Sequence, residues 1–319
     1  MRDHPSIYKK IVSINDLSQL LETNEDLITI SKNSENYYLP NPIITDSNRQ
    51  TYTVLSPLKE IHKEILNKIL DNVQYPPYLF GGIKGTNYIK DAELHRNAKQ
   101  IIHEDVSHFF DNINGKHIYN VWYRFFKLPH QISIILTDLT TYHNKLPQGA
   151  KTSTHLSNLV FWEFEPDMVS DFEKKGFIYS RFIDDISISS QDGFTIEDKQ
   201  YIIGKIFGMM CLVDLKPKRE KHKIENRKNK ISVHNLNLNS RRPTISKKER
   251  GQIRAAIFQL ENDVNNGLNL DNIPERIKSL EGRAEVMRKL HPLQGEKYIN
   301  RLRIVKEIFL QTSKLDGKK

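Results

Sequence analysis

Cysteine is almost absent from this chain, which has Cys211 alone among its 319 residues. One thiol can form neither an intrachain disulfide nor a zinc site without other ligands, so the sequence excludes disulfide scaffolds and cysteine-rich zinc modules. Cys211 lies in an apolar run over residues 209–213, and this predicts a buried core position for its side chain.

Long apolar runs are also missing. No stretch approaches the roughly 20 consecutive apolar residues that a membrane-spanning helix needs. The first residues, MRDHPSIYKK, contain no apolar segment of the kind found in secretory signals. We therefore expect a soluble, cytoplasmic protein without a membrane partner. Internal repeats and low-complexity tracts are absent as well, which excludes solenoid architectures.

Acidic residues are scarce relative to basic ones, because 48 Lys and Arg face 39 Asp and Glu, giving a net charge of +9. The imbalance is concentrated between Lys216 and Arg254, where the sequence has 14 basic and 3 acidic residues. Solubility alone could explain a net positive charge, but a solvated surface normally mixes the two signs. The clustering favours a track for a polyanion such as a nucleic acid.

The pattern of apolar residues predicts helices first, then mixed strands and helices, then helices again, which is an α+β fold. Helical spacing is found over 14–30, 58–70, 199–212, 247–261 and 299–310. Strands are predicted at 100–106 and 231–238, with hairpins over 37–54 and 177–189.

Three acids lie where apolar strands end. Asp184 and Asp185 interrupt the strand-like run from Tyr179 to Ile188, and Asp105 closes the strand that begins at Gln100. An Asp-Asp pair alone is typical of an exposed hairpin turn. Half-buried carboxylates that repel one another, however, usually have a cation to bind. With Val106 beside Asp105, the three acids can converge on two divalent ions for phosphoryl transfer. Mg²⁺ suits such oxygen ligands, and Mn²⁺ can replace it.

The ordered segments around these acids resemble the motifs A, B and C of reverse transcriptases. They are Asp105-Val106-Ser107-His108-Phe109-Phe110, Leu146-Pro147-Gln148-Gly149 with Leu156-Ser157-Asn158-Leu159, and Phe182-Ile183-Asp184-Asp185. The similarity extends from about Arg49 to the C-terminus and is closest to bacterial retron and retron-like enzymes. It implies a right-hand polymerase fold, with N-terminal helices and fingers over 1–99, a palm with interleaved fingers elements over 100–240, and a helical thumb over 241–319.

The resemblance also implies roles for single residues. Asp105, Asp184 and Asp185 become the catalytic metal ligands, and Phe110 becomes a steric gate that favours deoxynucleotides. Gln148 and Gly149 would support the nascent base pair, and Arg49 would contact the triphosphate. Lys218 would protonate pyrophosphate, although Lys216 and Lys221 lie near enough to leave the register open, and a single lysine in a basic run is often only solvated. Nucleic acid would contact Phe182 and the thumb residues Lys247, Lys248, Arg250 and Arg254.

Some segments depart from the retron pattern: Phe-Ile-Asp-Asp replaces Tyr-Ala-Asp-Asp at 182–185, Asp replaces Asn at 91, and Val-His-Asn replaces Val-Thr-Gly at 233–235. A related defence-associated enzyme fits comparably well. The resemblance implies a magnesium-dependent reverse transcriptase that copies a cognate noncoding RNA into DNA from deoxynucleoside triphosphates, in antiphage defence with an effector protein. The alternatives are a template-independent or protein-primed DNA polymerase, and a catalytically silent RNA-binding scaffold.

Overall fold

The computed structural model describes residues 11–23, 25–43, 49–240, 242–268 and 272–316, with side chains up to residue 311. The chain divides into two compact units. The N-terminal unit comprises Met1–Leu94 and Ala98–Asn226, and the C-terminal unit comprises His95–Asn97 and Arg227–Lys319. Across the described helices, none combines the length and the apolar character that crossing a lipid bilayer requires.

The N-terminal unit is mainly helical, with one principal sheet. Its helices are α1 Ile14–Leu20, α2 Leu27–Lys32, α3 Leu58–Lys68, α4 Tyr88–Leu94, α5 Phe109–Asn112, α6 Gly115–Asn120, α7 His130–Thr140, α8 Ser153–Leu159, α9 Glu165–Lys174 and α10 Ile196–Leu212. A π-helix, η4, continues α6 over Val121–Phe125, and 3₁₀ turns cover η2 Ser34–Tyr37, η3 Leu70–Asn72 and η5 Arg219–Lys221.

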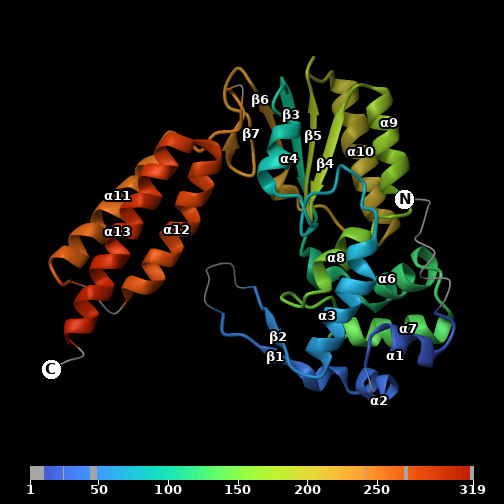
Figure 1. Ribbon diagram of the computed structural model, residues 1–319. Helices are drawn as coiled ribbons and strands as arrows, with labels where there is room; N and C mark the ends of the chain where they lie inside the picture. The colour runs from blue at the N-terminus through green and yellow to red at the C-terminus, as the bar shows by residue number, and fades with distance from the viewer. Residues whose placement is uncertain (1–10, 24, 44–48, 241, 269–271, 317–319) are drawn as a thin grey trace. The chain divides into compact units, whose positions relative to one another are not determined.

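The principal sheet has four antiparallel strands in the order β4-β5-β3-β6. They are β3 Gln100–Asp105, β4 Ile178–Phe182, β5 Asp185–Ser190 and β6 Lys223–Asn226. Helices α4 and α9 both contact β4, and α9 also contacts α10 (Figure 1). A separate hairpin pairs β1 Tyr38–Pro40 with β2 Tyr52–Val54. This mixture of helices and antiparallel strands confirms the α+β class.

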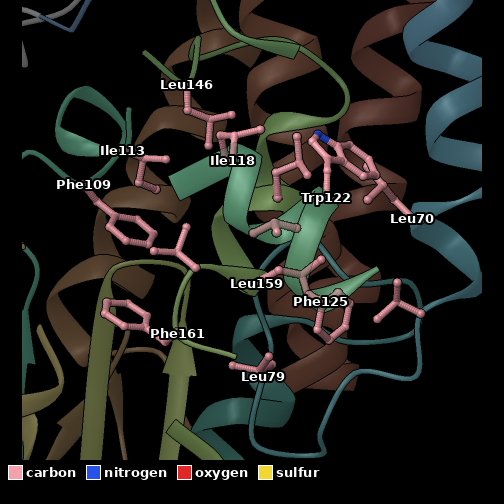
Figure 2. Close-up of a cluster of buried hydrophobic side chains, with 14 of the residues drawn as sticks. Leu70, Leu79, Phe109, Ile113, Ile118, Trp122, Phe125, Leu146, Leu159 and Phe161 are labelled. Atoms are coloured by element: carbon pink, nitrogen blue, oxygen red, sulfur yellow. The ribbon is translucent and has the colours of Figure 1, made fainter. Parts of the chain in front are cut away.

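A continuous apolar core connects the sheet with the helices beside it. Trp122 and Phe125 are fully buried, and Figure 2 shows them gathered with Leu159 in this core. Phe109 stacks on Phe161 at a centroid distance of 5.9 Å, which joins α5 to the segment that follows α8. Since burying one large apolar side chain contributes roughly 1.5–3 kcal/mol, this core fixes the end of β3 firmly.

The C-terminal unit consists of a short hairpin, β7 Ser232–Val233 with β8 Leu236–Asn237, and three helices, α11 Lys247–Asn265, α12 Ile273–Leu290 and α13 Pro292–Asp316. The helices pack through buried residues at helical spacing, among them Ile257, Leu280 and Leu302. Arg301 forms a two-bonded ion pair with Glu261, at 2.6 and 2.7 Å, which links α13 to α11.

Most of the expected elements are confirmed, including the hairpin over 37–54, the strand ending at Asp105 and the long helix ending at Leu212. The predicted strand over 231–238 is wrong. His234 and Asn235 adopt left-handed backbone conformations, with φ of 49° and 63°, so this segment turns back on itself as the β7–β8 hairpin. The buried position predicted for Cys211 is also wrong, because its thiol lies on an exposed face of the last turn of α10.

Candidate active site

A tight turn between β4 and β5 presents the two adjacent acids. Ile183 and Asp184 form this turn, and Ile183 has a φ of 62°, which is rare for a β-branched residue. Asp185 begins β5 and lies directly opposite Asp105 in the β3–β5 register. The main-chain N–H of Val106 donates to the Asp184 carbonyl at 3.1 Å. Backbone pairing therefore brings Asp105 to the adjacent Asp184 and Asp185, which follow it by about 80 residues in the sequence.

Burial and mutual repulsion dominate the electrostatics of these acids. Asp105 is 2% exposed, and burial raises its pKa to about 6, with a further upward contribution from the hydrogen bond with Asp185 and the charge of Asp184. The pKa of Asp184 is also raised, first by burial and then by the charge of Asp185. A nearby cation stabilises carboxylates in this arrangement as anions.

Lys221 supplies such a cation in the structure. Its Nζ donates to Asp105 and lies 3.4 Å from Oδ1 of Asp185. Burial lowers the pKa of Lys221, but the hydrogen bond to Asp105 and the charges of Asp185 and Asp184 raise it by more, so the ammonium is retained. The ammonium of Lys221 thus bridges β3 and β5 and forms ion pairs with both carboxylates. In the described residues, no group of three or more His, Cys, Asp or Glu side chains has the arrangement of a ready-made metal cluster.

The predicted nucleotide-binding residues lie on several segments of the N-terminal unit. Phe110 is half-buried against the core. Burial raises the pKa of Asp184, and the charge of the exposed Arg49 is a small contribution in the opposite direction. Gln148 accepts a hydrogen bond at its carbonyl from the Tyr52 N–H at 2.8 Å. Gly149 has a φ of 104°, and a Cβ there would lie 2.6 Å from the Tyr52 carbonyl oxygen, so glycine is required.

Lys218 and Lys221 lie at the same end of β3 but make different contacts. Lys218 donates its main-chain N–H to the Asp105 carbonyl at 2.7 Å, whereas the side chain of Lys221 contacts the carboxylates. The intervening 3₁₀ turn, Arg219–Lys221, carries Lys221 back toward the acids. Sequence reasoning left this register open, and no local pattern could have resolved it.

The predicted nucleic-acid residues other than Phe182 belong to the C-terminal unit. Lys247, Lys248 and Arg254 are exposed on α11, and Arg250 is half-buried. Phe182 ends β4 and pairs with Asp185 across the hairpin. Arg241, which the sequence counts in the basic cluster, lies outside the described residues.

A buried ion pair that the sequence analysis missed lies beneath the turn. Arg181 and Glu165 are both fully buried, and the guanidinium forms two hydrogen bonds to the carboxylate, at 2.6 and 2.8 Å. Arg181 also donates to the Ile183 carbonyl at 2.9 Å and to the Asn158 carbonyl at 3.0 Å. The guanidinium therefore ties the turn to α8 and α9. The available signal was an arginine inside an otherwise apolar strand, since such a charge needs a buried partner.

A glycine loop packs against the same turn from the other side. Phe80 donates its N–H to the Arg181 carbonyl at 3.0 Å, and Asn158 donates its amide to the Gly81 carbonyl at 2.6 Å. A Cβ at Gly81 would lie 2.3 Å from Cγ1 of Ile183. The bulky Ile183 is thus accommodated because position 81 has no side chain.

Comparisons with known proteins give a matching family and several relatives. Residues 40–238, more than half of the chain, match the family model described as reverse transcriptase (RNA-dependent DNA polymerase). The retron Se72 reverse transcriptase of Salmonella heidelberg is 29% identical over 255 residues, covering 78% of this chain and 67% of that protein. The retron Ec48 reverse transcriptase of Escherichia coli is 28% identical over 267 residues, covering 79% and 65%. The match to the Escherichia coli retron Ec86 reverse transcriptase, 29% identical, covers 45% and 44%.

The chain therefore spans about two thirds of the length of the first two relatives and less than half of the third.

Proposed function

This chain belongs to the reverse transcriptase family, the RNA-directed DNA polymerases, and we propose that it copies an RNA template into DNA at a two-magnesium site formed by Asp105, Asp184 and Asp185. The observation that carries the proposal is that Asp105 and Asp185, opposite each other in the β3–β5 register, both contact the ammonium of Lys221, while the charge of Asp184 also acts on it. Members of the family generally depend on divalent metal ions, and the oxygen-only donor set fits Mg²⁺ or Mn²⁺.

Asp105, Asp184 and Asp185, with Val106 beside Asp105, would hold two magnesium ions, which would supply activation of the primer 3′-hydroxyl and stabilisation of the pyrophosphate leaving group. Lys221 would give a proton to the pyrophosphate oxygen, because its ammonium lies against Asp105 and Asp185, where the triphosphate would bind. Lys218, the sequence-based candidate for this role, would instead hold the Asp105 backbone.

The remaining site residues select and orient the nucleotide. The half-buried ring of Phe110 excludes a ribose 2′-hydroxyl, which favours deoxynucleoside triphosphates. Arg49 attracts the triphosphate, as its electrostatic effect on Asp184 supports. Gln148 and Gly149 form a backbone platform fastened to β2, on which the new base pair rests.

We assign residues 1–99 to N-terminal helices and fingers, 100–240 to the palm with interleaved fingers elements, and 241–319 to the thumb. The relatives are named as retron reverse transcriptases, and this supports a cognate noncoding RNA as the template of the present chain. Antiphage defence together with an effector protein is the biological role we propose.

The test is primer extension by the purified protein on an RNA template with deoxynucleotides and Mg²⁺. Asp184→Asn removes one anionic ligand with little change in shape, so we expect synthesis to fall by on the order of 10²–10³-fold or more. Asp192→Asn, the same change at an exposed acid that follows β5, serves as the control and should leave synthesis unchanged. Undiminished synthesis by Asp184→Asn would contradict the assignment.

A further inference from the structure

A group of aromatic rings, two of them exposed and that of Tyr119 half-buried, lies on α6, η4 and α7, none of which contributes a carboxylate of the active site. We call Tyr119, Tyr123 and His130 the aromatic stack. The rings of Tyr119 and Tyr123 are nearly parallel, at 19°, with centroids 5.3 Å apart. Tyr119 is held in place because its hydroxyl lies 2.8 Å from Nδ1 of His130, which begins α7. The aromatic stack is therefore already formed in the structure.

The backbone of η4 exposes Tyr123 and buries the residues next to it in the sequence. The π-helix η4 has a hydrogen bond from the Phe126 N–H to the Val121 carbonyl at 3.0 Å. Trp122 and Phe125 point into the core (Figure 2), whereas Tyr123 between them is 45% exposed. Packing of the unit does not require an exposed ring there, and π-helices occur frequently at functional sites.

The chain segment that carries the stack is rich in basic residues. Residues 112–137 contain no Asp or Glu, and they include Lys116, Arg124 and Lys127. Lys116 is paired with Asp214 at 3.6 Å. Arg124 and Lys127 are exposed, and neither forms an ion pair within the part of the chain that the structure describes. The surface thus offers two cations beside a pair of stacked rings.

We propose that the aromatic stack binds unpaired nucleotides of single-stranded RNA, with bases stacking on the tyrosines and phosphates held by Arg124 and Lys127. Every base has a π-face that can extend a stack of aromatic side chains, and phosphates complement the exposed cations of Arg124 and Lys127. This proposal rests on the proposed function, because it names a second contact for the RNA partner. It places that contact on elements separate from those that carry the three acids.

Photocrosslinking locates the contact directly. The full-length protein is irradiated with a single-stranded RNA of about 12 nucleotides that contains 4-thiouridine, and is then digested with trypsin. Cleavage after Lys116 and Arg124 releases one peptide, residues 117–124, that contains both tyrosines. We expect crosslinked nucleotides on this peptide, declining as salt rises. Tyr123→Ala should reduce the yield roughly tenfold, and Tyr123→Phe should retain it, since stacking needs the ring alone.

Tyr201 provides a matched internal control. It also lies beside lysines, with Nζ of Lys175 and Lys205 at 5.0 and 5.5 Å from its ring centroid, but Lys205 is paired with Asp171. Its tryptic peptide, residues 200–205, should carry little label. A fully paired RNA duplex with the same label should mark residues 117–124 weakly, because its bases are already stacked.

Label confined to other peptides, or equal label with Tyr123→Ala, would overturn the proposal, and the exposed stack would then be a surface for a protein. Primer extension by the same preparations keeps the two ideas apart. Extension without label at residues 117–124 contradicts the stack alone. Label there without extension supports the stack and contradicts the proposed polymerase function.

Discussion

His62 is a histidine that the fold keeps neutral. It is 1% exposed on α3, its Nε2 lies 2.6 Å from the Leu139 carbonyl, and its Nδ1 has no hydrogen-bond partner among the described residues. Burial lowers its pKa to about 4, although the hydrogen bond to Leu139 acts in the opposite direction. The unfolded chain, with an ordinary histidine pKa near 6.5, therefore binds a proton more readily than the folded protein.

We predict that this histidine makes the protein less stable in acid. The folded-state pKa is the lower one, so the free energy of unfolding should be unaffected above pH ~6.5 and should fall between pH ~6.5 and ~4, by about 3 kcal/mol in total. Urea unfolding at a series of pH values measures this slope. His62→Gln should flatten it, while His143→Gln, at an exposed histidine paired with Glu35, should not. An unchanged slope in His62→Gln would disprove the account.

Phe109 and Phe110 are adjacent but have different expected roles, Phe109 in core packing and Phe110 in selecting the sugar of the nucleotide. Phe109 is 2% exposed and stacks on Phe161, whereas the ring of Phe110 is only partly covered. We predict that Phe110→Ala retains most of the stability and reduces discrimination against ribonucleotides, on the order of 10²-fold. Phe109→Ala should instead cost about 3–5 kcal/mol of stability. Thermal unfolding and competing incorporation of the two sugar types test both statements, and unchanged sugar selectivity in Phe110→Ala would remove its assigned role.

At the scale of elements, the β4–β5 turn depends on a buried cation. Arg181→Lys keeps the charge but loses the forked donors, which leaves the Ile183 carbonyl without its hydrogen bond. We predict that the maximal rate of synthesis falls by up to about 10²-fold, because the neighbouring acids move from their positions. More Mg²⁺ should be needed for half-maximal activity.

The matched variant for this prediction is Tyr179→Phe, which removes one hydrogen bond to the same Glu165 without touching the turn. It should lower thermal stability while leaving the magnesium requirement unchanged. If both variants lose activity in parallel with their melting temperatures, Arg181 serves stability alone.

The same turn shows what the sequence could and could not predict. The alternation of apolar residues around Asp184 and Asp185 is local, so the hairpin and its acids were predictable from periodicity. The pairing of Arg181 with Glu165 depends on how α9 packs against β4, which no local pattern encodes. Lys221 was placed by a 3₁₀ turn whose three residues decide which lysine faces the acids.

At the scale of the whole molecule, the net positive charge lies in the C-terminal unit. Residues 95–97 and 227–319 contain 22 Lys and Arg against 10 Asp and Glu, a net charge of +12. The net charge of the chain is +9, so the N-terminal unit carries a net charge of −3. The unit that holds the acids is therefore slightly anionic, and the long-range attraction that follows from net charge comes from the C-terminal unit.

We predict that basic residues of α11 contact the phosphates of the bound nucleic acid directly. Replacing Lys247, Lys248 and Arg254 by Gln should weaken the affinity for primed RNA template. A plot of log affinity against log salt concentration should become less steep by about 2–3, because each lost phosphate contact means one fewer phosphate whose counterions are released. The control changes the same net charge elsewhere in the unit, at the exposed Lys278, Lys289 and Arg303. Binding measured over a salt series compares the two triple variants at equal net charge. If both lower the slope equally, the attraction is a property of overall charge, and α11 has no special role as the nucleic-acid track.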